Sequence, residues 1–177
     1  MWGTPGRIHL YCGDGKGKTT AALGLAVRAA GSGLRVLLVQ FLKGRETGEL
    51  DSLRLLPGIT VMRSDFGEKF TFQMTREERE QAAYKTVLLF ETAFRRAKEE
   101  SADMLILDES VTAVERGVIP EETLKKHVEE CRHVFEIVMT GSVPEPWMIE
   151  LADYVTDMEK IKHPFDRGIA ARRGIEY

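Results

Sequence analysis

Short apolar runs alternate with helix-prone segments along almost the whole chain. The runs at 34–41 and 104–107 are apolar on both faces, which is typical of parallel strands covered on both sides of a sheet. The full set of predicted strands is 7–12, 34–41, 59–62, 104–107, 135–140 and 154–158. The apolar faces of a sheet built from these strands must be buried, and helices packed against the sheet would bury them.

The segments between these strands favour helix. Residues 19–30 are rich in Ala and Leu and end at Gly31-Ser32-Gly33. A long helix is predicted from Thr75, because Thr75 and Glu78 fit a capping box. Its predicted apolar stripe is Ala83, Val87, Phe90, Phe94 and Ala97, and further helices are expected near 49–56, from Pro120 (with Leu124, Val128 and Cys131 on one face) and over 144–152.

Strand–helix alternation of this kind predicts an α/β fold, with a mostly parallel sheet and helices on both faces, in one domain spanning residues 1–177. In such sheets the ligand lies beyond the carboxyl ends of the strands. Candidate chemical groups are therefore expected among the residues that follow each strand.

Composition narrows the class of protein. The 177 residues are 43% hydrophobic, which excludes a disordered chain, and two cysteines are too few for a disulfide scaffold. The net charge of −3 weighs against a nucleic-acid partner. No apolar run approaches the ~20 residues of a membrane span, and the first residues lack a secretory signal. We therefore expect a cytoplasmic protein with no membrane partner and with Cys12 and Cys131 reduced and buried.

A glycine-rich loop stands where the first strand turns into a helix. Residues 12–20 follow the phosphate-loop pattern G-x-x-x-x-G-K-[ST] in their second half, Gly17-Lys18-Thr19, whereas Cys12 holds the place of the first glycine. Gly13 and Gly15 still allow the backbone N–H groups to curl around an anion, and the helix adds its positive end. Lys18 can charge-pair with phosphate, and the Thr19 hydroxyl can bind magnesium. The loop predicts a nucleoside triphosphate site.

Two acids follow the strand at 104–107. A phosphate-loop enzyme requires a carboxylate at a neighbouring strand end to organise magnesium, and Asp108-Glu109 occupies such a place. The alternative is an ordinary helix start enriched in acids. With the loop already present, the magnesium interpretation is favoured. Phosphoryl transfer, a motor step and another displacement on the same nucleotide all remain open at this point.

Motifs spread along the chain resemble one family. They comprise residues 13–22 with the Gly-Lys-Gly-Lys-Thr-Thr run, 28–29, Gly31, 39–44, 107–109, 140–141, 162–169 with Lys-His-Pro-Phe-Asp, and 174–177. Together they resemble the P-loop family of ATP:corrinoid adenosyltransferases, which act on cob(I)alamin or cob(I)yrinic acid a,c-diamide. The resemblance covers nearly the whole chain and implies a RecA-like P-loop fold.

The resemblance implies an unusual reaction. Corrinoid cobalt, reduced to Co(I), attacks the 5′ carbon of ATP, and the whole triphosphate leaves. ATP is held in the opposite sense from other P-loop enzymes, so that the loop grips the γ-phosphate. The family implies ATP as co-substrate, magnesium or manganese, a corrinoid substrate, a reductase or flavodoxin-type electron donor, and a homodimer.

The resemblance also implies site residues. Those expected at the nucleotide are Gly13, Asp14, Gly15, Lys16, Gly17, Lys18, Thr19, Thr20, Arg28 and Lys43; those expected at the metal are Thr19, Asp108 and Glu109; those expected in catalysis are Lys18, Phe70 and Phe72. The two phenylalanines would lie against the corrin and help remove the lower ligand of cobalt.

Several of these positions have a structural alternative. Arg28 could instead face a partner subunit, Lys43 could be a solvated lysine, and the two phenylalanines could belong to the core. His163 is expected to be structural, not a cobalt ligand.

The chain departs from the family pattern at three positions. Asp14 stands where asparagine is common, and an acid there would weaken phosphate binding unless it faces magnesium. Ser142 stands where relatives often have arginine, and Phe72 where tryptophan can occur.

The competing functions are a RecA-like ATPase module in a nucleic-acid or protein assembly, a small-molecule kinase, and a nucleotide-gated carrier of corrinoid.

Overall fold

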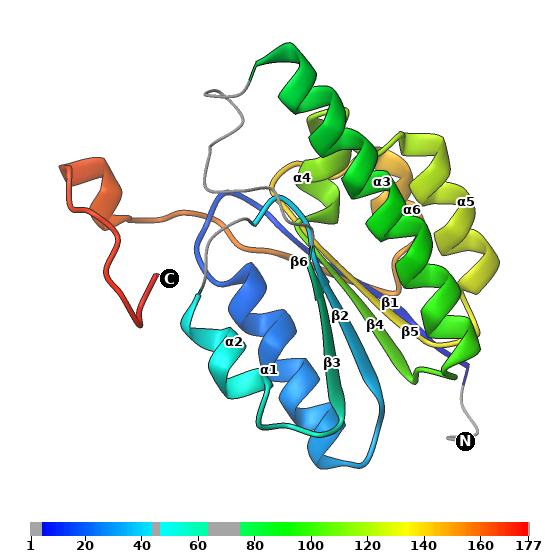
Figure 1. The fold of residues 1–177 in the computed structure, drawn as a ribbon. Helices are drawn as coiled ribbons and strands as arrows, with labels where there is room; N and C mark the ends of the chain where they lie inside the picture. The colour runs from blue at the N-terminus through cyan, green and yellow to red at the C-terminus, as the bar shows by residue number, and fades with distance from the viewer. Residues whose placement is uncertain (1–4, 44–46, 64–74, 177) are drawn as a thin grey trace.

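The computed structural model describes residues 5–43, 47–63 and 75–176, and the structural statements below refer to these. Six strands form one parallel sheet in the order β3-β2-β4-β5-β1-β6 (Figure 1). Their bounds are β1 Ile8–Cys12, β2 Val36–Gln40, β3 Ile59–Arg63, β4 Met104–Asp108, β5 Glu136–Thr140 and β6 Tyr154–Asp157. The predicted mostly parallel sheet is confirmed.

Helices cover both faces of the sheet, as predicted. In Figure 1, α1 and α2 lie on one face, and α3, α4, α5 and α6 lie on the other. The bounds are α1 Lys18–Gly31, α2 Gly48–Leu53, α3 Arg76–Glu99, α4 Ser110–Glu115, α5 Glu121–Cys131 and α6 Pro146–Leu151, with a short 3-10 helix at Pro164–Arg167. None of the helices in the described part of the chain has the length and hydropathy to cross a membrane.

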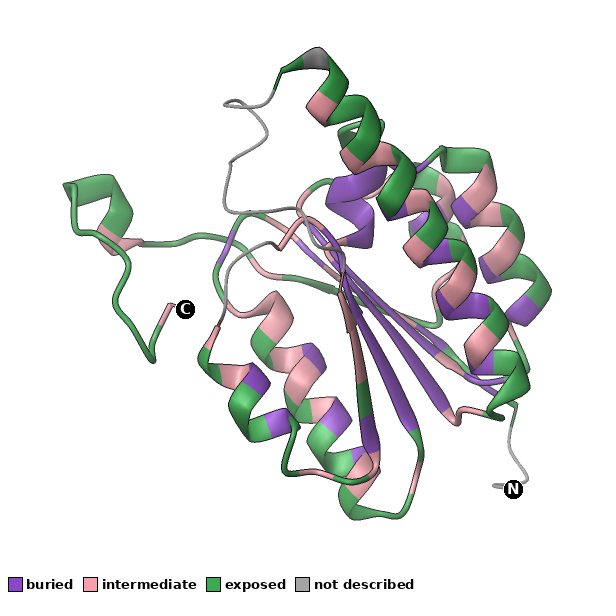
Figure 2. Cartoon of the chain, in the orientation of Figure 1, coloured by how far each residue is buried: buried purple, intermediate pink, exposed green. Residues whose placement is uncertain are grey.

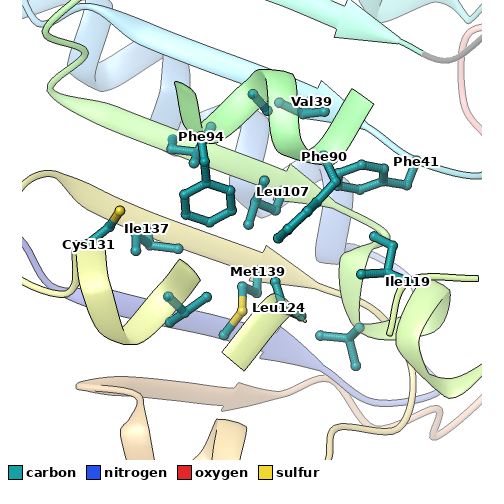
Figure 3. Close-up of a cluster of buried hydrophobic side chains, with 14 of the residues drawn as sticks. Val39, Phe41, Phe90, Phe94, Leu107, Ile119, Leu124, Cys131, Ile137 and Met139 are labelled. Atoms are coloured by element: carbon teal, nitrogen blue, oxygen red, sulfur yellow. The ribbon is translucent and has the colours of Figure 1, made fainter. Parts of the chain in front are cut away.

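Alternating strand residues divide the core into two clusters. Leu38 and Ile106 face α1, where the small residues Ala22, Ala26 and Ala29 allow the helix to lie close to the sheet. The α3 face is filled by larger side chains (Figure 3); its labelled members are Val39, Phe41, Phe90, Phe94, Leu107, Ile119, Leu124, Cys131, Ile137 and Met139. The central strands are buried along their whole length in Figure 2, so the sheet is a rigid support for residues at its ends.

Local signals in the sequence match the structure closely. Thr75 Oγ1 accepts a hydrogen bond from Glu78 N at 3.2 Å, and Thr75 N donates to Glu78 Oε2 at 2.9 Å, which confirms the capping box. Both cysteines are buried and unpaired, as predicted. Burial raises the pKa of the Cys12 and Cys131 thiols, so both stay protonated at neutral pH.

The short helix α4 was not predicted. It follows β4 directly, with Glu109 at its N-cap in the left-handed region (φ 64°). Its sequence Ser-Val-Thr-Ala-Val-Glu is rich in β-branched residues, which have low helix propensity. Every residue from Ser110 to Val114 is buried, so packing against the sheet outweighs that propensity.

The register of the sheet brings the strand ends into one row. Gln40, the last residue of β2, pairs with Asp108, the last residue of β4. Leu107 pairs with Met139, which sets Asp108 beside Thr140 at the end of β5. Parallel strands thus deliver three polar side chains from distant parts of the sequence to one edge, next to the loop that follows β1.

Candidate functional site

The glycine-rich loop connects β1 to α1. Gly13 and Gly17 have φ values of 100° and 121°, which L side chains rarely adopt. A Cβ at Gly13 would collide with Asp157, and one at Gly15 would collide with the backbone of Met158. Gly13 N donates to Ser142 O at 2.9 Å and Gly15 N to Met158 O at 2.6 Å, so the loop is fixed to the segments after β5 and β6.

Lys18 closes the loop on itself. Its Nζ donates to Gly13 O and Gly15 O, each at 2.7 Å, which holds the ammonium across the loop. Lys18 is also the first residue of α1, and the first backbone N–H groups of a helix have no partner inside the helix. A positive side chain and the positive end of a helix dipole therefore coincide here, an arrangement that suits a phosphate group.

A buried carboxylate stands at the centre of the strand ends. Asp108 is fully buried, and its Oδ1 accepts hydrogen bonds from Thr19 Oγ1 at 2.9 Å and Thr140 Oγ1 at 2.7 Å. Its Oδ2 accepts from Lys43 Nζ at 2.6 Å and Gln40 Nε2 at 3.2 Å. We call these five residues the strand-end network. The paired cation and the three neutral donors offset the cost of burying this charge.

Glu109 lies outside the strand-end network, at the turn between β4 and α4. Its backbone N donates to Thr140 Oγ1 at 2.9 Å, and the residue occupies the N-cap position of α4, where its side chain makes no capping hydrogen bond. Its side chain is half-buried. The structure thus separates the two acids: Asp108 lies inside the strand-end network, and Glu109 lies at the turn beyond it.

The strand-end network has the chemistry of a magnesium site. Thr19 Oγ1 and an Asp108 oxygen lie 2.9 Å apart, and hydroxyl and carboxylate oxygens are the hard ligands that Mg²⁺ prefers. Gln40 Oε1 is buried and has no hydrogen-bond partner among the described residues, which leaves an acceptor for a metal-bound water. The described residues contain no group of three His, Cys, Asp or Glu side chains placed to hold a metal ion.

The outer side of the loop contacts the segment that follows β6. Asp14 Oδ1 accepts a hydrogen bond from Lys160 N at 2.8 Å, so this acid is engaged with backbone. Lys16 Nζ lies 3.2 Å from Ile175 O and 3.4 Å from Glu176 Oε1. We call these the loop–tail contacts. Hydrogen bonds from Arg172 lower the pKa of Glu176 to about 2, so its carboxylate stays charged at neutral pH.

Several residues singled out in the sequence are not members of the strand-end network. Arg28 is exposed in the last turn of α1, ten residues and therefore about 15 Å along the helix from Lys18. Thr20 is exposed in the first turn of α1, close to the loop. Phe70 and Phe72 lie outside the described residues. His163 accepts a hydrogen bond from Phe165 N at 3.1 Å as the cap of the 3-10 helix, a structural role of the kind expected.

Two members of the strand-end network were not predicted as site residues. Gln40 and Thr140 are polar and fully buried, and each ends an apolar strand. That pattern is visible in the sequence: a polar residue closes each of three parallel strands. It could have identified both residues as neighbours of Asp108.

Known structures place the fold in a class. A KaiC-like protein from Pyrococcus horikoshii OT3 superposes with a TM-score of 0.55 over 90% of this chain and 75% of that chain, at 18% identity. ATPases 2 and 3 of EssC from Geobacillus thermodenitrificans superpose with a TM-score of 0.50 over 96% of this chain and 35% of that chain, at 16% identity. The sheet, the loop and the strand-end carboxylate define a P-loop protein of RecA-like fold.

Sequence comparison then gives the family. The model of the "ATP:corrinoid adenosyltransferase BtuR/CobO/CobP" family matches residues 4–177, and the chain belongs to this family. Corrinoid adenosyltransferases from Escherichia coli K12 and Pseudomonas aeruginosa PAO1 are 36% and 33% identical to it, over 97% of this chain and 86% and 84% of theirs. The corrinoid adenosyltransferase of a Sinorhizobium species is 36% identical over 97% of this chain and 80% of its own.

Proposed function

We propose that this chain transfers the 5′-deoxyadenosyl group of ATP to the cobalt of a corrinoid and releases inorganic triphosphate. The observation that carries the proposal is the family match over residues 4–177, which includes both the glycine-rich loop and Asp108. Three relatives at 33–36% identity are named corrinoid adenosyltransferases.

The reaction is a displacement at carbon. The electron pair of Co(I) forms the cobalt–carbon bond, the C5′–O5′ bond breaks, and its electron pair leaves with the triphosphate. No bond between phosphorus and oxygen breaks. The corrinoid must be reduced before the transfer, and we assign that electron to a separate reductase or a flavodoxin-type donor.

Lys18 and the start of α1 stabilise the leaving group in this proposal. Negative charge builds up on the triphosphate as the C5′–O5′ bond breaks, and donors already in place for that charge lower the barrier. Lys18 would exchange the carbonyls of Gly13 and Gly15 for phosphate oxygens, a short movement for an ammonium already at the loop. With the γ-phosphate in the loop, the 5′ carbon points outward to the corrinoid.

Magnesium, or manganese in its place, supplies further charge neutralisation to the triphosphate. Thr19 and Asp108 would hold it, with Glu109 at the same strand end. Gln40 and Thr140 keep the Asp108 carboxylate in place from the neighbouring strands. The remaining loop residues, Gly13 to Thr20, would surround the phosphates.

The corrinoid side of the site is assigned by resemblance. We propose that Phe70 and Phe72 lie against the corrin and favour the form without a lower ligand, which is easier to reduce to Co(I). Phe72→Ala should then slow the reaction of cobalamin more than that of a corrinoid lacking the lower-ligand base. Equal losses with both substrates would refute this role. We also propose a homodimer, in which Arg28, far from the loop, faces the partner subunit.

A product assay tests the proposed function. The chain is incubated with ATP, Mg²⁺ and chemically reduced corrinoid, and the products are followed by ³¹P NMR and by the light-sensitive absorbance of the adenosylcorrinoid. We expect triphosphate and adenosylcorrinoid in equal amounts. ADP and phosphate as the sole products would refute the proposal and favour an ATPase. Single-turnover analysis would separate catalysis from simple delivery of a corrinoid.

A further inference from the structure

Lys43 contacts both residues that we propose as metal ligands. Its Nζ lies 2.6 Å from Asp108 Oδ2 and 3.1 Å from Thr19 Oγ1. Leu42, the residue before it, has a φ of 56°, a left-handed conformation that non-glycine residues rarely adopt. Arg63 donates a hydrogen bond to Lys43 O at 3.1 Å, which fixes the backbone of Lys43 beside the network.

The carboxylate of Asp108 has no acceptor place left. A carboxylate oxygen accepts about two hydrogen bonds, and Oδ1 and Oδ2 each have two donors. A cation that binds Asp108 directly must therefore displace one of the four donors. Which donor leaves decides how the metal enters.

Lys43 is the donor that can leave. Gln40 and Thr140 are fully buried residues of central strands, and moving either would disturb the sheet. Thr19 belongs to the first turn of α1 and is itself a proposed ligand. The Lys43 side chain is 22% exposed and ends a flexible four-carbon stem, so its ammonium can turn toward solvent or toward a bound phosphate.

We propose that the Lys43 ammonium, paired with Asp108 and Thr19, takes the cation position, so that divalent metal enters only together with a nucleotide that draws the ammonium away. This inference rests on the proposed function for the identity of the metal and of the nucleotide. A divalent ion arriving alone meets a saturated carboxylate and a positive charge beside it. A triphosphate arriving with the ion offers the displaced ammonium a new anionic partner.

Metal affinity in the absence of nucleotide is the quantity that this arrangement controls. Removing the ammonium frees one acceptor place on Asp108 Oδ2 and removes the repulsion. Lys43→Met removes the charge with little change in side-chain length, whereas Lys43→Arg keeps the charge. We expect Lys43→Met to bind Mn²⁺ about tenfold more tightly than the unchanged chain, a coupling of ordinary size between two sites.

The experiment titrates the full-length chain with Mn²⁺, without nucleotide or corrinoid, and counts free Mn²⁺ by electron paramagnetic resonance. Lys126→Met is the matched control, because it removes an exposed lysine of α5 that has no part in the site. Lys126→Met and Lys43→Arg should bind Mn²⁺ as weakly as the unchanged chain. Adding Asp108→Asn to Lys43→Met should abolish the gain, which places the ion at Asp108.

Equal Mn²⁺ affinity in Lys43→Met and the unchanged chain would overturn the inference, as would micromolar binding of Mn²⁺ to the unchanged chain alone. Lys43→Leu, which also removes both the charge and the hydrogen-bond donor, gives the same comparison if Lys43→Met does not fold. The Mn²⁺ titration contains neither ATP nor corrinoid. Failure of adenosyl transfer would therefore leave this result standing, and a negative result here would leave the proposed transfer intact.

Discussion

The two sides of the glycine-rich loop are held in contrasting ways. On the inner side, the strand-end network surrounds a fully buried Asp108 with donors from two strands, a helix and the turn after β2. On the outer side, the loop–tail contacts join exposed Lys16 to Ile175 and Glu176. The inner side fixes charge in advance, whereas the outer side can be exchanged for a ligand at little cost.

Lys18 lies between these sides, and its loss should have the largest effect. Lys18→Ala removes the positive charge that we assign to the leaving triphosphate. Loss of one such preorganised donor typically costs 10²–10³ in rate, so we expect adenosyl transfer to fall about 10³-fold. Turnover is measured by triphosphate release, with Lys126→Ala as the control. An unchanged rate in Lys18→Ala would mean that Lys18 does not stabilise the leaving triphosphate.

Breaking the inner side should destabilise the fold itself. Asp108→Ala leaves Gln40, Thr140 and Lys43 without their acceptor, and two of these are fully buried. We expect a loss of about 3 kcal/mol in the free energy of unfolding, measured in urea. Asp108→Asn keeps an acceptor oxygen and should lose less. Equal stability of Asp108→Ala and the unchanged chain would mean that the network contributes nothing to folding.

A smaller change on the inner side should give a smaller loss of stability. Thr140→Val conserves shape but leaves Glu109 N without its acceptor and Asp108 without one donor. The expected loss in the free energy of unfolding is about 2 kcal/mol. Thr156→Val, on the exposed edge strand β6, is the matched control and should change stability by less than about 0.5 kcal/mol. Comparable losses in the two variants would mean that the hydrogen bonds of Thr140 add nothing to stability.

The outer side should show the smallest effect and a distinct pH signature. Glu176 has its pKa lowered to about 2 by Arg172, from an ordinary value of 4.5. Any stability from its contacts is therefore complete above pH 4.5 and is lost only as the pH falls toward 2. Carbon-13 NMR of the Glu176 carboxyl should show no titration between pH 7 and 3.5, and Glu176→Gln should lack the signal. A midpoint near 4.5 would mean that the contacts with Arg172 and Lys16 do not form.

Much of the fold could be predicted because its signals are local. Apolar runs marked the strands, and the capping box fixed the start of α3. Helix α4 could not be predicted, because its β-branched sequence favours strand and only burial against the sheet makes it helical.

The positions of some candidate site residues could be predicted for the same reason, and those of others could not. The loop and Asp108 follow from motif and spacing, whereas the roles of Gln40 and Thr140 depend on strand order and register. The hydrogen bond from Lys160 N to Asp14 could not be predicted either, because the two residues are 146 positions apart in the sequence and only the fold brings them together.

Adenosyl transfer and ATP hydrolysis differ in which bond of ATP breaks. The most direct measurement uses ATP labelled with ¹³C at the 5′ carbon, with Mg²⁺ and reduced corrinoid, and follows ¹³C and ³¹P NMR together. We expect the labelled carbon to move to cobalt while all three phosphates stay joined. A labelled carbon that remains bonded to oxygen while a phosphate is released would contradict the proposed transfer.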